Sequence, residues 1–317
     1  MRNLEMIHIN EEELGQGPNS SVHSYIDIYN DKQWVVKKIK AEDSRCFLKV
    51  MRGIVHSFNL DHPNIVTVKN HHVEPLENKS YNVYIQMLRM EENFESFRDK
   101  KREENEMSIN KEVIIKVFNE VLTALEYLHK RELAHGNIKP TNILFDTEGK
   151  ARLSDIGFTY VIPEGESLDS IFDELYYQSP EKIVALKNDI ECDLEKADIW
   201  SLGMVIAESI LGKSRLIEPI ATLEEKEEAI KKIIEEIKEK DFDGLGSLVE
   251  NMIAFQSDDR LDLSQIRKKL ENDFKEIVAV EVLTMHRMIF KELGKRWKRR
   301  REGKRERKRK EWTLDSN

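Results

Sequence analysis

One ordered series of polar motifs constrains the fold of this chain more than any other feature. Residues 135–144 read HGNIKPTNIL, and DIG follows at 155–157, so that Asp155 comes eighteen residues after Asn137. Further along come SPE at 179–181, DIWSLG at 198–203 and Arg260 within SDDRL. A series of this length at these spacings is not a chance pattern, and the chain must adopt a fold that uses all of it.

The elements around this series change character along the chain. The β-branched and aromatic runs Thr67–Asn70 and Tyr81–Leu88 predict strands, with a turn at Asn30-Asp31. Apolar residues at helical spacing from Ile109 to Leu128 predict a helix of five turns. Two short strands are predicted next, Ile143–Phe145 and Ala151–Leu153, with a turn between them at Glu148-Gly149 and an irregular stretch after them to about residue 180. Three further helices are predicted: a buried one over Ile199–Leu211, a charged surface helix over Leu223–Lys240, and an amphipathic one over 274–293. The order is a β-rich half, a helical half and a tail.

Two features of the β-rich half are ambiguous alone. Residues 13–22 read ELGQGPNSSV, in which Gly15 and Gly17 favour either an ordinary turn or a hairpin whose backbone amides approach a phosphate. Lys37 follows Gly15 by twenty-two residues within WVVKKI, where a strand lysine is ordinarily solvated.

Taken together, these motifs resemble the signature set of the eukaryotic protein kinases, over roughly residues 9–273. The resemblance implies an α+β, bilobal protein kinase fold, with a small β-rich N-lobe (9–90) and a larger α-helical C-lobe (91–273). Residues 1–8 form an N-terminal extension, and residues 274–317 form the amphipathic helix and a basic tail. The stretch Tyr84–Met87 is also similar to kinases that phosphorylate translation initiation factor 2.

The resemblance also implies site residues and a cofactor, ATP with Mg²⁺. Lys37 corresponds to the lysine that contacts the ATP phosphates, and Lys139 to the cation near the transferred phosphoryl group. Asn142 and Asp155 correspond to the magnesium ligands, since amide and carboxylate oxygens suit a hard cation. Glu181 and Arg260 are implied to form a buried ion pair, and Asp198 to tie its helix to the loop at 135–144. The other implied nucleotide contacts are Gly15, Gly17, Val22, Val35, Met87, Leu88, Met90 and Leu144.

The chain departs from the family pattern at the base. The family motif is His-Arg-Asp, and here it is His135-Gly136-Asn137. The family's Asp accepts the proton of the substrate hydroxyl, which the amide of Asn137 cannot do at neutral pH. Loss of a positioned base costs about 10²–10⁴ in rate. Gly136 removes the arginine that receives a phosphorylated activation loop.

A second departure concerns the partner of Lys37. The family places a Glu nine residues before His62, and here that position is Gly53, with no acidic residue between Asp43 and Asp61. Lys37 then lacks its usual carboxylate unless Glu42 or Asp43 reaches it. Three smaller departures are Glu174 in place of a substrate-loop Thr, Val35 in place of an Ala above the adenine, and Ile156 in place of a Phe.

Composition bounds the remaining possibilities. Hydrophobic residues make up 39% and charged residues 35% of 317, and no apolar run approaches the ~20 residues of a membrane span. No signal peptide is recognised, and two isolated cysteines, Cys46 and Cys192, favour a reducing compartment. We expect a cytoplasmic protein.

The net charge of −9 conceals two oppositely charged parts. Lys295–Lys310 contains twelve Lys or Arg and two Glu, a net charge of +10, so the other residues together carry −19. The tail is either a solvated segment or a site for RNA, anionic lipid or a nuclear import receptor.

These observations predict an ATP-binding protein with the protein kinase fold that is catalytically impaired, a pseudokinase that regulates or scaffolds a protein partner. One alternative is a slow Ser/Thr kinase that transfers phosphate to a protein substrate. A second is an adaptor that binds polyanions or is targeted to the nucleus through its tail.

Overall fold

The computed structural model describes residues 13–17, 19–27, 32–103, 109–157, 175–188, 190–217, 222–240 and 244–278. The turn predicted at Asn30-Asp31, the N-terminal extension, Glu174, the tail, and residues 279–293 of the predicted amphipathic helix lie outside these ranges. By its internal contacts the chain divides into two units, Met1–Lys269 and Leu270–Asn317. The fold and the site described below belong to the first unit.

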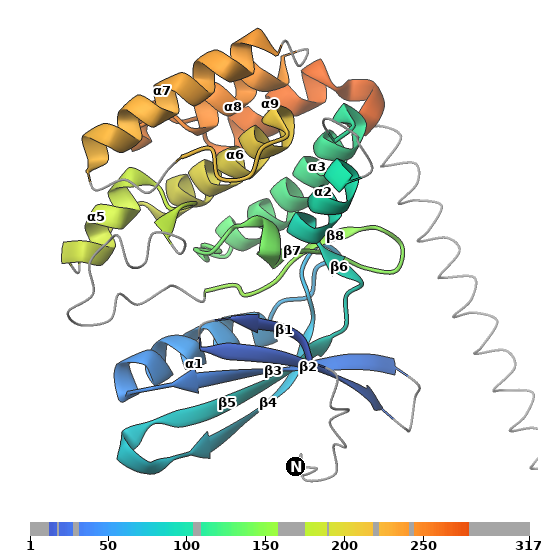
Figure 1. The fold of residues 1–317 in the computed structure, drawn as a ribbon, viewed down its shortest axis with the longest axis vertical. Coiled ribbons are helices and arrows are strands. Elements are labelled where there is room, and N and C mark those ends of the chain that lie inside the picture. The colour runs from blue at the N-terminus through green and yellow to red at the C-terminus, as the bar shows by residue number, and fades with distance from the viewer. Residues whose placement is uncertain are drawn as a thin grey trace, which may run out of the picture. The chain divides into compact units, whose positions relative to one another are not determined.

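Five of the strands in the described residues form one antiparallel sheet, in the order β1-β2-β3-β5-β4 (Figure 1). They are β1 (Glu13–Gly17), β2 (Ser20–Asp27), β3 (Lys32–Ala41), β4 (Val68–Pro75) and β5 (Tyr81–Leu88). The short 3₁₀ helix η2 (Glu77–Lys79) connects β4 to β5. The sheet and α1 (Ser44–Phe58) form the N-lobe of a bilobal α+β fold.

Helix α1 begins at a defined cap. The side chain of Asp43 accepts a hydrogen bond from the Cys46 amide at 2.7 Å, which satisfies one of the otherwise unpaired N–H groups of the first turn. Ile54 of α1 is completely buried and packs with Val83 and Ile85 of the sheet. This apolar contact fixes the face that the helix turns toward β5.

The C-lobe consists of helices and a second, three-stranded sheet in the order β6-β7-β8 (Figure 1). Its elements are β6 (Glu92–Asn93), α2 (Phe94–Glu103), α3 (Lys111–His129), η3 (Pro140–Asn142), β7 (Ile143–Phe145), β8 (Ala151–Leu153), α5 (Pro180–Asn188), α6 (Leu194–Leu211), α7 (Leu223–Glu239), α8 (Leu245–Met252), η5 (Ser257–Asp259) and α9 (Leu263–Asp273).

Helix α6 is the core of this lobe. Every residue from Ala197 to Leu211 is buried, and the helix contacts α3, α5, α7 and α8. The near-continuous apolar sequence predicted burial over Ile199–Leu211, and this prediction is confirmed. The helix ends at Gly212, whose φ of 65° is the left-handed conformation that glycine adopts at little cost.

Backbone hydrogen bonds join the two lobes near β8. The amide of Val66 donates to the Leu153 carbonyl at 2.9 Å, and the amide of Leu153 donates to the Asn64 carbonyl at 2.9 Å. The segment that leads from α1 to β4 is thereby held against the strand that precedes Asp155.

The predicted elements agree with the observed ones apart from their ends. The helix predicted from Ile199 begins at Leu194, because the Asp193 side chain caps it by accepting from the Lys196 amide. The strand predicted at Thr67–Asn70 continues to Pro75, because β4 pairs with β5 as far as Pro75 opposite Tyr81. The helix predicted from Ile109 begins at Lys111, because the Asn110 side chain caps it by accepting from the Glu112 amide. The helix predicted over Leu223–Lys240 ends at Glu239 and buries Ile230, Ile233 and Ile237 on one side.

Candidate active site

The glycine-containing segment forms a hairpin that leads directly to Lys37. Gly15 pairs with Val22 across β1 and β2, and Val22 pairs in turn with Lys37 of β3. A Cβ atom added at Gly15 meets nothing within 4 Å, whereas one added at Gly17 meets the Ser20 hydroxyl at 2.9 Å. The surface over Gly15 is therefore open, which a backbone that receives an anion requires.

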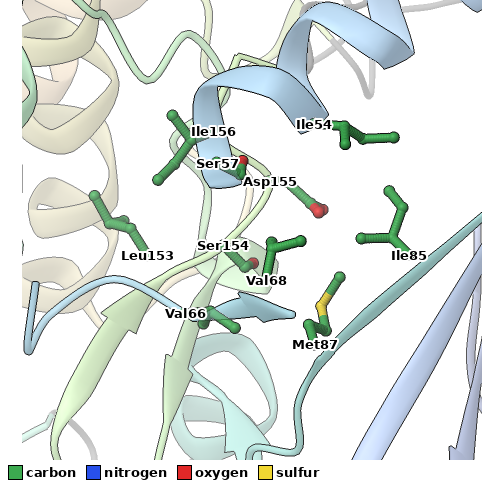
Figure 2. Close-up of a pocket in the computed structure, with 10 residues that line it drawn as sticks. All are labelled: Ile54, Ser57, Val66, Val68, Ile85, Met87, Leu153, Ser154, Asp155 and Ile156. Atoms are coloured by element: carbon green, nitrogen blue, oxygen red, sulfur yellow. The ribbon is translucent and has the colours of Figure 1, made fainter. Parts of the chain in front are cut away.

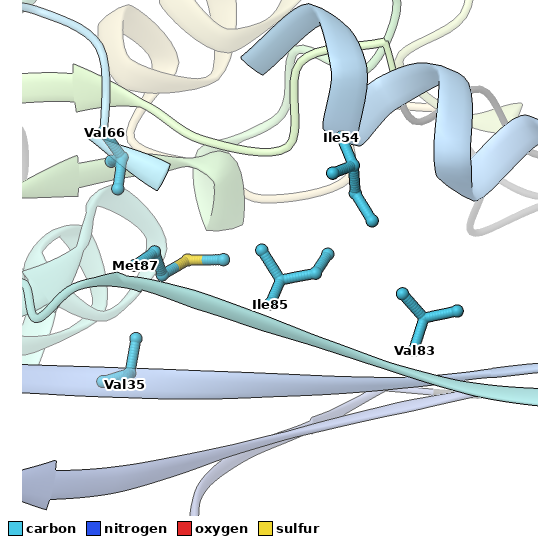
Figure 3. Packing of buried hydrophobic residues seen from close by; sticks show 6 residues of the cluster. All are labelled: Val35, Ile54, Val66, Val83, Ile85 and Met87. Carbon is cyan, nitrogen blue, oxygen red and sulfur yellow. The ribbon is translucent and has the colours of Figure 1, made fainter. Parts of the chain in front are cut away.

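An apolar cluster lies beside this hairpin (Figure 3). Val35 of β3 pairs with Met87 of β5, and both side chains are buried. Val22, Met90 and Leu144 are partly buried and pack against the same cluster. The structure thus brings together five of the predicted nucleotide contacts. Leu88 does not join them, because its side chain packs with Trp34 and Val36 in a separate cluster.

The loop that carries Asn137 and Lys139 is anchored by a buried histidine. His135 Nε2 lies 2.9 Å from the Ser154 carbonyl, and its Nδ1 accepts from the Asn137 amide at 3.1 Å. The carbonyl of His135 accepts from the Gly157 amide at 2.9 Å. Complete burial lowers the pKa of His135, so the neutral ring spans the loop and the segment 154–157.

Asp198 of α6 also holds this loop in place, through its carboxylate. Its carboxylate accepts from the amides of His135 at 2.7 Å and Gly136 at 2.8 Å, and it lies 3.0 Å from His129 Nε2. Burial alone raises the pKa of Asp198, but these hydrogen bonds and the nearby histidines outweigh it and hold the pKa below its ordinary value. The connection that the resemblance implies for Asp198 is confirmed.

The two candidate magnesium ligands sit on adjoining segments. The Asn142 side-chain amide donates to the Asn137 carbonyl at 2.8 Å, which leaves Oδ1 as the atom that can bind a cation. The Asn142 carbonyl accepts from the Ser154 amide at 3.0 Å, next to Asp155. Asp155 has a φ of 60°, a left-handed conformation that is uncommon for a residue other than glycine and is found at functional sites.

Asp155 is also the carboxylate that meets Lys37. Lys37 Nζ donates to Asp155 Oδ2 at 2.6 Å, and the two side chains are 16% and 13% exposed. Neither alternative suggested by the sequence takes this role, because Glu42 lies 3.7 Å from Lys40 and Asp43 caps α1. One carboxylate therefore serves both the lysine and the candidate metal position.

Gly53 lies where α1 meets the segment after Asp155. A Cβ added at Gly157, whose φ is 74°, meets the Gly53 Cα at 3.3 Å and His56 Nδ1 at 3.4 Å. Ser57 donates to the Gly53 carbonyl at 2.8 Å. The backbones approach closely because neither residue has a side chain.

A small cavity lies beside Met87, between α1 and the segment 153–156 (Figure 2). It is lined by Ile54, Val66, Leu153 and Ile156 among others, and Asp155 and Met87 close two of its sides. Its volume is about 10 Å³, room for about one water molecule. Ile156 is 2% exposed, which confirms the prediction that it packs as an apolar residue.

The ion pair implied at the end of the activation segment is present. Arg260 binds both carboxylate oxygens of Glu181, at 2.5 and 2.7 Å. The guanidinium also lies 4.9 Å from the ring centroid of Trp200 on α6. This bidentate ion pair fixes α5 against the core of the C-lobe.

The burial of two lysines is not predicted from the sequence. Lys182 of α5 is 2% exposed and Lys226 of α7 is 3% exposed. Lys226 lies 5.8 Å from the Trp200 ring centroid, and burial lowers its pKa to about 7. The sequence feature that could have indicated the burial of Lys182 is its position directly after Ser179-Pro180-Glu181, among the residues that α5 buries with Ile183 and Ala185.

Neither a membrane-spanning helix nor a cluster of metal-ligating side chains occurs among the described residues. None of the helices in those ranges is long and apolar enough to cross a membrane. In the same ranges, no group of three or more His, Cys, Asp or Glu side chains has an arrangement that could hold a metal ion. Among the predicted ligands, Asp155 supplies a carboxylate and Asn142 an amide.

The fold and the motif series together define a protein kinase domain. The family model described as protein kinase domain matches residues 8–270, and the chain belongs to that family.

The chain is also similar to individual kinases and to a kinase-related adapter. It is 32% identical, over 71% of its length, to the probable serine/threonine-protein kinase MRK1 homolog of Encephalitozoon cuniculi. It is 30% identical over 60% of its length to the STE20-related kinase adapter protein strd-1 of Caenorhabditis elegans, and 25% identical over 63% to an Aurora kinase of Candida glabrata. These matches span 64%, 48% and 52% of the three relatives.

Proposed function

We propose that this chain is a nucleotide-binding pseudokinase, in which phosphoryl transfer is impaired and the bound nucleotide regulates a protein partner. The observation that carries the proposal is the 2.6 Å ion pair between Lys37 and Asp155. Helix α1 contains no acidic residue that could draw the lysine away from Asp155. A lysine held by Asp155 is a poorer clamp for phosphates.

The remaining residues fit ATP with Mg²⁺, the cofactor of the family. The Asn142 amide oxygen and the Asp155 carboxylate are hard oxygen ligands, and the open backbone at Gly15 suits a phosphate. When bound, the metal ion offsets the negative charge of the phosphates. Asp155 then has to exchange its contact with Lys37 for one with the cation, which weakens binding without abolishing it.

The position of the base supports the loss of catalysis. The backbone of Asn137 is held on both sides, by His135 Nδ1 and by the Asn142 side chain. Its own side chain is an amide, which donates and accepts hydrogen bonds but takes up no proton. The loop therefore keeps its geometry while losing the group that removes the hydroxyl proton.

A slow Ser/Thr kinase is the second candidate, favoured by the intact anchoring of the loop through His135, Asp198 and Gly157. Phosphoryl transfer depends mostly on positioning and charge, so an ordered loop permits some transfer without a base. The name of one relative, a kinase adapter protein, agrees instead with a regulatory role.

Phosphate transfer from labelled ATP distinguishes these candidates. We expect transfer to casein, or to the chain itself, to rise about 10²-fold in Asn137→Asp, because the variant regains a proton acceptor. The exposed Asn188→Asp, which adds the same charge on α5, serves as the control and leaves the rate unchanged.

Asp155→Ala supplies the counter-test. A wild-type rate above background that Asp155→Ala abolishes and Asn137→Asp raises contradicts the pseudokinase proposal and establishes the slow kinase. A rate that survives Asp155→Ala comes from a contaminating enzyme.

A further inference from the structure

Helix α5 directs a lysine into the protein interior. Lys182 is 2% exposed, whereas Lys187, on the same helix, is exposed to solvent. Burying a long cationic side chain is costly unless its donors find partners. The position of Lys182 therefore requires an explanation from its contacts.

The partner of Lys182 is the candidate catalytic loop. Its Nζ donates to the carbonyl oxygen of Gly136. The Gly136 amide donates to Asp198 Oδ1 at 2.8 Å. Gly136 has a φ of 73°, so the turn adopts a conformation that glycine accepts readily. Residue 136 is thus held from both sides, by α5 through its carbonyl and by α6 through its amide.

The charges around Lys182 favour a cation at this place. The negative charges of Asp198 and Glu181 both favour the charged form of Lys182, and the charge of Glu181 is already matched by Arg260. Burial lowers the pKa of Lys182, and Asp198, Cys192 and Glu181 oppose that shift. Asp198 is a buried carboxylate that holds the same loop, because it accepts hydrogen bonds from the loop amides of His135 and Gly136.

We propose that Lys182 is the positioning residue of this loop, a built-in cation that ties the end of the activation segment to Gly136 and sets the loop geometry without a phosphoryl group. The side chain comes from α5 and reaches the carbonyl oxygen of Gly136, a residue that contributes no side chain of its own. Lys182 and Asp198 then clamp the loop as part of the fold. The inference deepens the proposed function, and its test uses nucleotide-free protein so that the two can fail separately.

Residue-resolved hydrogen exchange of the full chain tests the clamp. In Lys182→Met, which keeps the length and removes donor and charge, we expect the amides of His135 and Gly136 to exchange about 10-fold faster or more. Amides in the middle of α6 report global unfolding and keep their protection. Lys187→Met is the matched control and leaves the loop unchanged.

Two further arms separate a positioning cation from a packing residue. Lys182→Arg restores the cation and returns the loop to within a few-fold of wild-type exchange, and phosphatase treatment of the wild type changes nothing. If Lys182→Met does not fold, Lys182→Leu, which also removes the donor and the charge, is measured in its place with the same expectation. Unchanged loop exchange, equal acceleration in the loop and α6, failure of Lys182→Arg to restore protection, or loss of protection after phosphatase would each overturn the proposal.

Discussion

A buried ion pair between Arg260 and Glu181 holds α5 against the core of the C-lobe. Arg260 has a fully buried side chain, binds Glu181 through two nitrogens, and also donates to the Ala254 carbonyl at 2.7 Å. Removing one member of such a pair leaves the other charge buried without compensation, at a cost of about 3–5 kcal/mol. The pair therefore matters more for what its loss exposes than for its net stabilisation.

The Glu181–Arg260 pair makes stability depend on pH in a defined direction. Burial raises the pKa of Glu181, but the two hydrogen bonds and the charge of Arg260 outweigh it and lower the pKa below its ordinary value. The unfolded chain then binds more protons than the folded one, so this stability is present above the unfolded pKa and is lost as pH falls through the folded pKa. We expect the free energy of unfolding to fall below about pH 5.

Urea unfolding between pH 3.5 and 7 measures this effect. Glu181→Gln reduces the slope of stability against pH, and Asp198 maintains the rest, since its pKa is also lowered. The exposed Glu239→Gln is the control. A slope in Glu181→Gln equal to that of the wild type contradicts the assignment.

At this scale, family resemblance predicts the partners of Asp198 and Arg260 because both belong to motifs with fixed spacing. It does not predict the Lys37–Asp155 pair, because the sequence shows only that Gly53 removes the usual carboxylate. The replacement depends on how closely two backbones approach, which no local pattern in the sequence encodes.

Among the elements, α1 and the segment after Asp155 depend on each other. Gly157 and Gly53 bring the two backbones together, and the small cavity beside Met87 lies at the same junction. A Cβ at Gly157 would lie so close to the Gly53 backbone that α1 or the segment after Asp155 has to shift by a few tenths of an ångström.

Two glycines with similar backbone angles isolate this contact. Gly157 (φ 74°) and Gly149 (φ 70°) both adopt the left-handed conformation, but an added Cβ meets Gly53 and His56 only at Gly157 and nothing within 4 Å at Gly149. Both changes to alanine cost about 1–2 kcal/mol of backbone strain. We expect Gly157→Ala to cost about 1 kcal/mol more and to weaken nucleotide binding.

Urea unfolding and nucleotide titration of the two variants supply the comparison. Gly149→Ala is the control for Gly157→Ala, because it introduces the same backbone strain without the contact with α1. Equal stability and equal binding in the two variants would show that the approach of α1 to Gly157 has no energetic consequence.

Element positions are largely predictable from the sequence. β5, β7 and β8 begin and end at the residues predicted for them, and α6 is buried as its apolar sequence requires. The far half of β4 is not predictable, because His71 and His72 have no strand pattern and are ordered by pairing with β5. Long-range pairing determined that end of the strand, and local propensity did not.

For the molecule as a whole, the ion pair between Lys37 and Asp155 joins the two lobes at the candidate site. Lys37 comes from the five-stranded sheet and Asp155 from the segment after β8. A nucleotide that engages both residues acts on the contact between the lobes, and its differential affinity for open and closed arrangements is what a regulatory partner would sense.

Nucleotide binding at this site is tested by the thermal stability of the full chain with ATP, measured with and without magnesium. At ATP about tenfold above its Kd, we expect a rise in Tm of about 3–6 °C that is larger with magnesium, since binding at that excess adds about 1.4 kcal/mol. Lys37→Met loses the rise, and Lys38→Met, altered at the next residue of β3, keeps it. No rise in the wild type at millimolar ATP, with or without magnesium, would contradict nucleotide binding at this site and with it the central claim.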